Sequence, residues 1–159
     1  MGSRSKTNLA YIAGFLDGDG SLMLQIKKRK DGKSKLRFMP TICFYQDTRH
    51  AKTLHWIRRV LNIGYPSARR DGITELRVNG FQQVRDILHD LLPFIRFKKT
   101  QAVALHTAAR ILSNNAFKTL DNKTLKTLVD LILVIQDANY VTKRKKTRTE
   151  FYKVLGLTP

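Results

Sequence analysis

The amino-acid sequence predicts an α+β fold in which helices pack on an antiparallel sheet. The chain has 159 residues, the size of a single domain that can bury a core. Apolar residues recur at helical spacing in several segments and at every second position in others. The alternating segments come in two pairs that are separated by short turn signals, which is typical of β-hairpins. Such hairpins form antiparallel sheets, so helices and hairpins together indicate an α+β domain.

The first element is expected to be a helix over residues 7–18, capped by Thr7 or Asn8. Its apolar positions recur at helical spacing and are Leu9, Ile12, Ala13 and Leu16. From Ser21 the period changes to two and continues beyond a turn signal at residues 30–33. This pattern predicts a hairpin with one apolar face and one polar face.

A helix over residues 48–62 follows the first hairpin, and Gly64 and Pro66 stop it. A second hairpin pairs residues 67–70 with 74–78 through Asp71-Gly72, a dipeptide that favours tight turns. The rest of the chain is expected to be helical, over residues 80–92, 98–112, 121–137 and 149–155. We treat residues 1–159 as one domain, with a tail at 1–6 and a basic C-terminal extension at 139–159.

The net charge points to a polyanionic partner. Thirty Lys and Arg residues against twelve Asp and Glu residues give a formal charge of +18. Such an excess repels itself in the free protein and complements nucleic acid. A membrane is a weaker alternative, because no apolar run approaches the roughly 20 residues that span a bilayer. Cys43 is the only cysteine, which excludes an internal disulfide and a cysteine-built zinc site.

The most informative motif is the segment from Ile12 to Gly20, where two carboxylates and two glycines end the first helix. Acidic side chains are unfavourable at a helix C-terminus unless a cation offsets the helix dipole. Asp17 and Asp19 therefore suggest a divalent metal. An EF-hand loop is excluded, because Leu22 stands where that loop needs Gly and Lys28 where it needs Glu.

This segment resembles the signature motif of the LAGLIDADG homing endonucleases. Ala13, Gly14, Asp17, Asp19 and Gly20 match it by identity, and Gly18 is a small-for-small replacement. The predicted order of elements also matches the αββαββα core of that family, with extra C-terminal helices. The motif occurs once, so the resemblance is to the single-motif, homodimeric, intron-encoded type.

The resemblance implies the residues of the active site. Asp19 matches the metal-binding acid, and the backbone carbonyl of Gly18 matches a second metal ligand. Gln46 and Lys98 match residues that organise solvent around the metals; taken alone, they are an exposed strand end and a phosphate contact. Asp17 is expected to cap the end of its helix, the alternative being a direct metal ligand.

Small residues on the first helix indicate that another backbone passes close to it. Gly costs about 1 kcal/mol relative to Ala inside a helix, so Gly14 needs a reason. We expect Ala10, Ala13 and Gly14 to form the dimer interface with a second copy. The alternative is close packing within one chain.

The polar faces of the two hairpins are predicted to bind DNA. An antiparallel sheet can enter the major groove, where base edges present distinguishable patterns of donors and acceptors. Acidic residues are scarce on these faces, which favours DNA over a merely solvated surface. The predicted contact residues are Gln25, Lys27, Arg29, Lys35, Arg37, Thr41, Arg69, Glu75 and Arg77.

The resemblance implies a site-specific endonuclease that cuts both strands of a long pseudo-palindromic target and leaves 3′ overhangs. The resemblance implies Mg²⁺ as cofactor, with Mn²⁺ as a substitute and Ca²⁺ binding without cleavage. Expected partners are double-stranded DNA and a second copy, with no membrane and no small-molecule cofactor. The expected location is intracellular, in a prokaryotic, including archaeal, cytoplasm or in an organelle. The alternatives are a non-cleaving DNA-binding regulator and a maturase that binds intron RNA.

Overall fold

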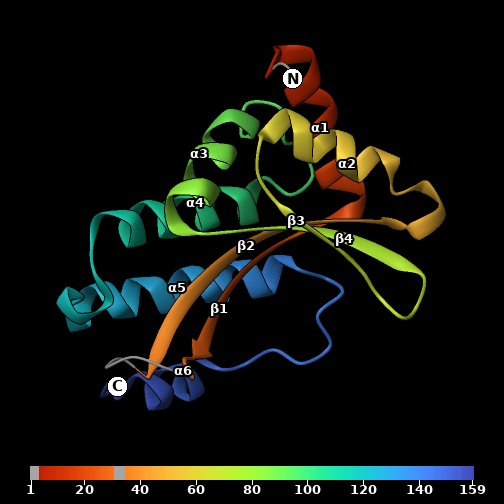
Figure 1. The fold of residues 1–159 in the computed structure, drawn as a ribbon. Helices are drawn as coiled ribbons and strands as arrows, with labels where there is room; N and C mark the ends of the chain where they lie inside the picture. Colours follow the sequence, from red (N-terminus) through yellow and green to blue (C-terminus); the bar gives the residue numbers. More distant parts are fainter. Residues whose placement is uncertain (1–3, 31–34) are drawn as a thin grey trace.

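The computed structural model describes residues 4–30 and 35–159, and within them it confirms the α+β fold (Figure 1). The helices and strands follow in the predicted order. Their bounds are α1 (Lys6–Asp19), β1 (Gly20–Lys28), β2 (Leu36–Asp47), α2 (Lys52–Leu61), β3 (Tyr65–Ala68), β4 (Ile73–Asn79), α3 (Phe81–Leu91), α4 (Lys99–Asn114), α5 (Asn122–Ala138) and α6 (Arg148–Leu155).

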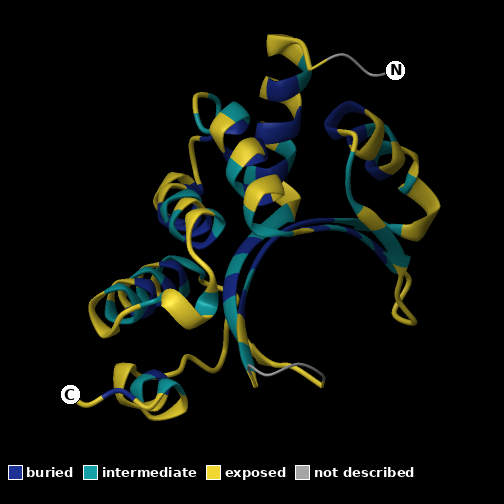
Figure 2. Cartoon of the chain, turned by 60° about the vertical axis from the view of Figure 1, so that its left-hand side comes forward, coloured by how far each residue is buried: buried dark blue, intermediate teal, exposed yellow. Residues whose placement is uncertain are grey.

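The strands form one antiparallel sheet in the order β1-β2-β4-β3. Gly20 pairs with Phe44 at one end of the first hairpin, and Cys43 pairs with Arg77 across the sheet centre. The sheet is bent into an arch, and the helices that carry the core lie on its convex side (Figure 2). The concave side is left for the polar faces of the strands.

The core lies between the convex face of the sheet and the buried faces of the helices. Helix α1 contributes the four apolar residues predicted from its spacing: Leu9, Ile12, Ala13 and Leu16. From the strands come side chains at alternate positions, including Leu22, Ile42, Phe44, Leu76 and Val78, all at most 1% exposed. Because α1 leads directly into β1, packing of both elements fixes the acidic segment at their junction.

Some predicted boundaries were wrong. Helix α1 begins at Lys6, and Ser5 is its N-cap in place of Thr7 or Asn8, since the Ser5 hydroxyl accepts the amide of Asn8 at 3.2 Å. The predicted helix over 48–62 divides into a 3₁₀ turn, Thr48–His50, and α2. Most of the predicted turn at 30–33 lies outside the described residues, as do residues 1–3 of the predicted tail.

Other local predictions were confirmed. The Asp71-Gly72 turn joins β3 to β4, and Gly72 adopts a positive φ of 81°, which a residue with a Cβ would resist. The carboxylate of Asp121 accepts the amide of Thr124 and caps α5. The last helix forms as α6, with a capping box between Thr147 and Glu150. Across residues 4–30 and 35–159, none of the helices has the length and apolar content to cross a membrane.

Candidate active site and nucleic-acid surface

The acidic end of α1 is joined to the loop before α4 by one carboxylate. Asp17 accepts the backbone amides of Arg96 at 2.8 Å, Phe97 at 3.1 Å and Lys98 at 2.9 Å. These amides precede α4, whose N-cap is Lys98 and whose first-turn amides have no partner within the helix. Asp17 therefore ties the end of α1 to the loop that precedes α4. This tie stands in place of the predicted cap on its own helix, and α4 itself has no side-chain cap bond at its N-cap.

The three amide bonds outweigh the burial of Asp17. Partial burial alone would raise the pKa of its carboxyl, but the bonds from Arg96, Lys98 and Phe97 and the nearby Lys98 ammonium lower it below its ordinary value. Asp17 is thus held as a carboxylate with its lone pairs committed to the 96–98 backbone. This commitment leaves it as a structural tie and argues against its alternative role as a metal ligand.

Lys98 is the most unusual cation of the site. It is only 5% exposed, and its ammonium donates a hydrogen bond to the backbone carbonyl of Asp17. Burial lowers the pKa of Lys98, and the charges of Asp17 and Asp19 partly offset that effect. A buried ammonium next to the acidic end of α1 is therefore built into the fold, in the place predicted for it.

Asp19 and Lys98 line the same cavity, whose volume is about 520 Å³. Gly18 and Asp19 come from the end of α1, and Lys98 and Gln101 come from the start of α4. The sheet and two loops supply the remaining lining residues, which are Ser21, Met23, Tyr45, Arg69, Asp71, Ile73, Asn139, Tyr140, Val141 and Thr142. The cavity thus joins the acidic end of α1, where the catalytic residues were predicted, to the concave face of the sheet.

Gln46 does not join this group. Its side-chain oxygen accepts the backbone amide of the next residue, Asp47, at 2.9 Å, and Gln46 does not line the cavity. Successive residues of a strand point to opposite faces, so Gln46 faces away from its neighbour Tyr45, which does line the cavity. Within one chain, the structure brings together only two of the three predicted catalytic residues.

The donors at the end of α1 suit a hard cation. Asp19 is exposed and carries a carboxylate, and Gly18 lies in the last turn of α1, where backbone carbonyls have no partner within the helix. Oxygen donors of this kind are those that Mg²⁺ and Ca²⁺ prefer. In the described part of the chain, no three His, Cys, Asp or Glu side chains group as a metal site. Of the two carboxylates that line the cavity, Asp71 is paired with Arg69, and Asp19 has no ion-pair partner among the described residues.

Most of the predicted DNA contacts lie where DNA could reach them. Lys27, Arg29, Lys35, Arg37 and Arg69 are exposed, and Gln25, Glu75 and Arg77 are half-buried. Thr41 is fully buried, so its prediction as a DNA contact was wrong. Its hydroxyl donates to the side chain of Asn79 at 2.7 Å, and the longer side chains of its cross-strand neighbours, Met23 and Asn79, flank it.

The concave face also holds an ordered charge pair near its centre. Arg77 donates to the Glu75 carboxylate at 2.9 Å, and Cys43, the cross-strand partner of Arg77, is buried beneath the pair. Burial raises the pKa of the Cys43 thiol, so this cysteine is a neutral packing residue. Arg69 is paired with Asp71 at 2.6 Å at the rim of the catalytic cavity. Both arginines are therefore oriented before any DNA arrives.

The three residues that were predicted to form the dimer interface, Ala10, Ala13 and Gly14, lie on two different faces of α1. Ala10 and Gly14 are exposed, and a Cβ placed on Gly14 would meet no atom within 4 Å. Close packing within the chain therefore does not explain Gly14. Ala13 is fully buried in the core, which removes it from the predicted interface because it has no exposed surface for a second copy.

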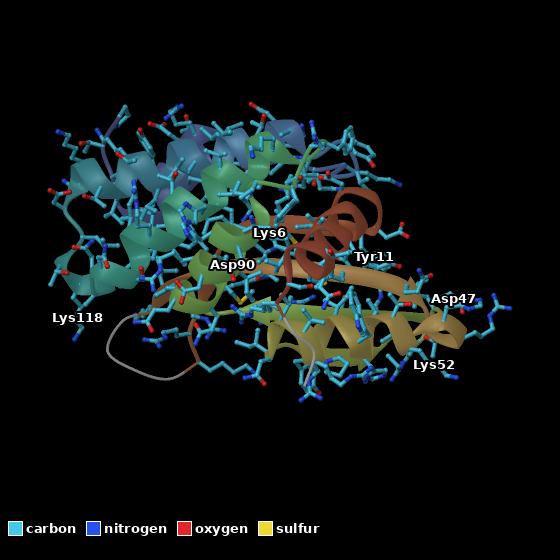
Figure 3. The ribbon with its side chains drawn as sticks, turned by 90° about the horizontal axis from the view of Figure 1, so that it is seen from above. Lys6, Tyr11, Asp47, Lys52, Asp90 and Lys118 are labelled. Carbon is cyan, nitrogen blue, oxygen red and sulfur yellow. The ribbon has the colours of Figure 1, made fainter. Side chains whose placement is uncertain are left out.

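Sequence reasoning missed the aromatic part of this surface. Tyr11 is 57% exposed on α1, and its ring packs edge-on against Trp56 of α2 with centroids 5.4 Å apart. Figure 3 shows Tyr11 on α1 in the view from above, with Lys52 at the start of α2. The available signal was the position of Tyr11 directly between Ala10 and the motif, which places it at the edge of the small-residue stripe.

The comparisons with known proteins agree with this fold. The family model described as LAGLIDADG endonuclease matches residues 12–109, which run from α1 into α4. The matching model and the mixed helix-and-sheet fold define the class as an endonuclease. The chain belongs to the LAGLIDADG endonuclease family.

Named relatives cover most of the chain. The DNA endonuclease I-CvuI of Chlorella vulgaris is 28% identical over 137 residues, which are 86% of this chain and 81% of that protein. The DNA endonuclease I-CreI of Chlamydomonas reinhardtii is 29% identical over 149 residues, 92% of this chain and 86% of that protein. A crystal structure of I-CvuI in complex with its target in the presence of calcium has a TM-score of 0.82 at 27% identity, covering 97% of this chain and 98% of that chain.

Proposed function

We propose that this protein is a homing endonuclease that acts as a homodimer and cuts both strands of a long pseudo-palindromic DNA site. The observation that carries the proposal is the cavity that joins exposed Asp19 and buried Lys98 to a concave, basic sheet. A sheet that only bound DNA would need neither an exposed carboxylate nor a buried ammonium at its end. Such groups are those that phosphodiester hydrolysis requires.

The proposed dimer is supported by residues that a single chain leaves exposed on α1. Each chain presents one exposed carboxylate at the end of α1, together with an exposed Gly14 and an exposed Tyr11 on that helix. Two copies related by a two-fold axis along this face would bring their α1 helices together at Gly14. The same axis would place two copies of Asp19 close to each other, and would match two half-sites of a pseudo-palindrome.

Asp19 and the carbonyl of Gly18 are the residues that would hold the metal, which we propose to be Mg²⁺. When bound, a divalent cation stabilises the charge on the scissile phosphate and lowers the pKa of a bound water. The relative I-CvuI has been crystallised with calcium and, on the I-CreI target, with magnesium and uncleaved DNA. We expect Mn²⁺ to substitute for Mg²⁺ here and Ca²⁺ to support binding without cleavage.

Lys98 supplies positive charge beside the phosphate without depending on the metal. Its ammonium is fixed by the Asp17 carbonyl, and its backbone is fixed by the Asp17 carboxylate. A preorganised cation of this kind stabilises charge that develops during reaction, since it needs no reorganisation at that moment. Asp17 is therefore a positioning residue and Asp19 a metal-binding residue.

The test uses supercoiled plasmids that carry a randomised insert. With Mg²⁺ the protein is expected to linearise a subset of plasmids, and sequencing of the ends reports both the target and the 3′ overhangs. Chelation of the metal should stop cleavage, and Asp19→Asn is the matched inactive variant. Binding of selected plasmids with no linear product would support a non-cleaving regulator instead. If the protein neither cuts nor binds any plasmid but is active in an intron splicing assay, the result would support a maturase.

A further inference from the structure

The segment between α5 and α6, residues 139–147, lies beside the catalytic cavity. It has no helix or strand of its own and loops past the sheet before α6 begins (Figure 1). Tyr140, Val141 and Thr142 line the same cavity as Asp19 and Lys98. The next four residues, 143–146, are all Lys or Arg. One short segment thus combines a wall of the cavity with a run of positive charge.

A pair of amides, one buried (Gln101) and one half-buried (Asn139), holds the start of this segment. The side chain of Asn139 donates to the backbone carbonyl of Leu22 in β1 at 3.1 Å. Gln101 donates to the Asn139 side-chain oxygen at 3.4 Å and to the Ala138 carbonyl at 3.2 Å. Gln101 is 4% exposed and lies one turn after Lys98 on α4. The amide pair therefore joins α4, the end of α5 and the edge strand β1 at one point.

A ring contact ties the wall to Lys98 from the other side. Tyr140 packs against Phe97 with ring centroids 6.1 Å apart, although each ring is about two-thirds exposed or more (71% and 66%). Phe97 directly precedes Lys98, and the Lys98 ammonium lies 5.4 Å from the Phe97 ring centroid. Phe97 thus contacts both Tyr140 of the wall and the Lys98 ammonium.

The far end of the segment has a separate attachment. The Gln136 side chain donates to the Lys146 carbonyl at 3.0 Å and accepts the Lys146 amide at 3.3 Å. Arg144 and Lys146 line a second cavity with Gln25 and Lys27 of β1. The basic run therefore continues the binding face of the sheet, and it is held independently of Asn139.

We propose that Gln101 and Asn139 are positioning residues for DNA cleavage. They hold residues 140–142 as a wall of the Asp19–Lys98 cavity, so that DNA bound by residues 143–146 and by the sheet meets the catalytic end at a fixed distance. Neither amide contacts the reacting phosphate in this proposal. The inference rests on the proposed endonuclease function, and it adds the link between the basic segment and the catalytic end.

Physical chemistry favours a positioning role for this pair. A buried amide such as that of Gln101 is costly unless it is hydrogen-bonded, and its directional bonds to Asn139 and Ala138 select a single arrangement of the elements that they join. An apolar pair could fill the same space without fixing that arrangement. Displacement of a reacting group by about 1 Å can reduce a rate by about 100-fold, so a small shift of the wall is enough to slow cleavage.

The experiment separates rate from affinity. The probe is the duplex recovered by the plasmid selection; affinity is measured with Ca²⁺ and the single-turnover rate with saturating protein and Mg²⁺. Asn139→Ala is expected to lower the single-turnover rate about tenfold or more, with a change in Kd of less than about threefold, since each phosphate contact remains. Gln101→Leu, which keeps the side-chain size, should have the same effect, and the double variant should not be additive.

Two controls complete the design. Asn122→Ala removes an exposed amide at the start of α5 and should change neither rate nor affinity. Gln136→Ala loosens the far end and should reduce affinity more than rate. Hydrogen exchange of residues 140–147 gives a readout without DNA, and exchange should rise in Asn139→Ala. If that variant fails to fold, Gln101→Leu and Asn139→Ser provide the same measurements.

The outcomes are distinct. A rate for Asn139→Ala and Gln101→Leu equal to that of the wild type, or a loss of affinity with no loss of rate, would overturn the positioning role. An unchanged exchange pattern at 140–147 would also overturn it. If the wild type cuts no plasmid, the proposed function fails instead, and the exchange measurement still reports whether the amide pair holds the wall.

Discussion

The catalytic end of the sheet and its concave face are built in opposite ways. At the catalytic end, Asp17 accepts three backbone amides and Lys98 is buried, so charges are compensated inside the chain. On the concave face the cations Lys27, Arg29 and Arg37 are exposed, and acidic residues are few. Asp17 and Lys98 in the first region therefore have their partners within the chain, whereas the second region carries unpaired positive charge that suits a polyanion.

The two regions are therefore expected to contribute to cleavage and to DNA binding through different electrostatic effects. In the proposed mechanism, the buried ammonium of Lys98 would act on a phosphate in a low dielectric, where each charge has a large effect. Exposed cations act through release of counterions, and their effect falls steeply with salt. We therefore expect changes at the catalytic end to affect rate or stability, and changes on the concave face to affect affinity and specificity.

The largest effect is expected at Asp19. Asp19→Asn removes the charge of the only exposed carboxylate of α1 without changing volume. Cleavage should fall by roughly 100-fold or more, because a metal ligand contributes several kcal/mol to transition-state stabilisation. Binding in Ca²⁺ and the unfolding temperature should stay close to wild type. Asp130→Asn, an exposed acid on α5, is the matched control, and wild-type cleavage by Asp19→Asn would contradict the site.

The next largest effect is expected at Gly14. Because a Cβ there meets nothing within 4 Å in one chain, Gly14→Leu should leave the monomer folded. Two copies approaching along α1 would meet the new side chain twice, so the dimer and cleavage should be lost together. Sedimentation at a fixed protein concentration measures the oligomeric state, and Lys123→Leu, at an exposed position of α5, is the control. A Gly14→Leu protein that remains dimeric would place the interface elsewhere.

The comparison also shows which features the sequence could predict. Local patterns such as the apolar stripe of α1, the hairpins and the Asp121 cap depend on neighbouring residues, and they were confirmed. The motif and its resemblance predicted Asp19 and Lys98, which the fold brings to one cavity. Gln46 was predicted through the same resemblance, and within one chain it does not reach that cavity.

Features that depend on distant contacts could not be read from spacing. Thr41 follows the alternating pattern that predicts the polar face of the hairpin. Its burial depends on the sizes of the side chains opposite it on the neighbouring strands, which this pattern does not contain. The partner of Asp17 in the Arg96 bond lies 79 positions away, and Asn139 bonds to Leu22 across 117 positions. No local rule identifies such pairs, because only the packed fold brings them together.

On the concave face, Arg77→Ala is expected to change base preference and to leave the cleavage rate nearly unchanged. Arg77 is oriented by Glu75, and an arginine that contacts guanine contributes about 1–3 kcal/mol of discrimination. The variant should relax the preference at particular bases while the rate on the best duplex changes little. Arg69→Ala should act at different bases, since Arg69 is paired with Asp71 at the cavity rim. Selection from a randomised library checks both, and an equal shift at every base would exclude them as reading residues.

A smaller effect is expected from Asp17→Ala, in stability. Loss of the Asp17 carboxylate leaves three backbone amides without their charged acceptor, and a hydrogen bond to a charged group contributes about 1.5–3 kcal/mol. Because the pKa of folded Asp17 lies below its ordinary value of 3.8, the carboxylate stabilises the fold above that pH, and the stabilisation is lost as pH falls through the folded-state pKa. Denaturant unfolding should therefore show a full difference from wild type at pH 7 that narrows below about pH 4. Asp130→Ala, a surface ion-pair partner of Arg148, should change stability less.

The smallest effect is expected in the basic segment. Lys143 and Arg144 are exposed, and neither has an acidic partner in the ion pairs found among the described residues. Replacing both with Gln should weaken binding to all sequences alike and flatten the plot of log affinity against log salt by roughly 0.9 per lost phosphate contact. The preferred sequence should not change, because phosphate contacts carry no base information. Titrations at several salt concentrations against the selected duplex and a scrambled one decide between the two regions. A changed base preference would move residues 143–144 from the phosphate-binding part of the surface to the part that reads bases.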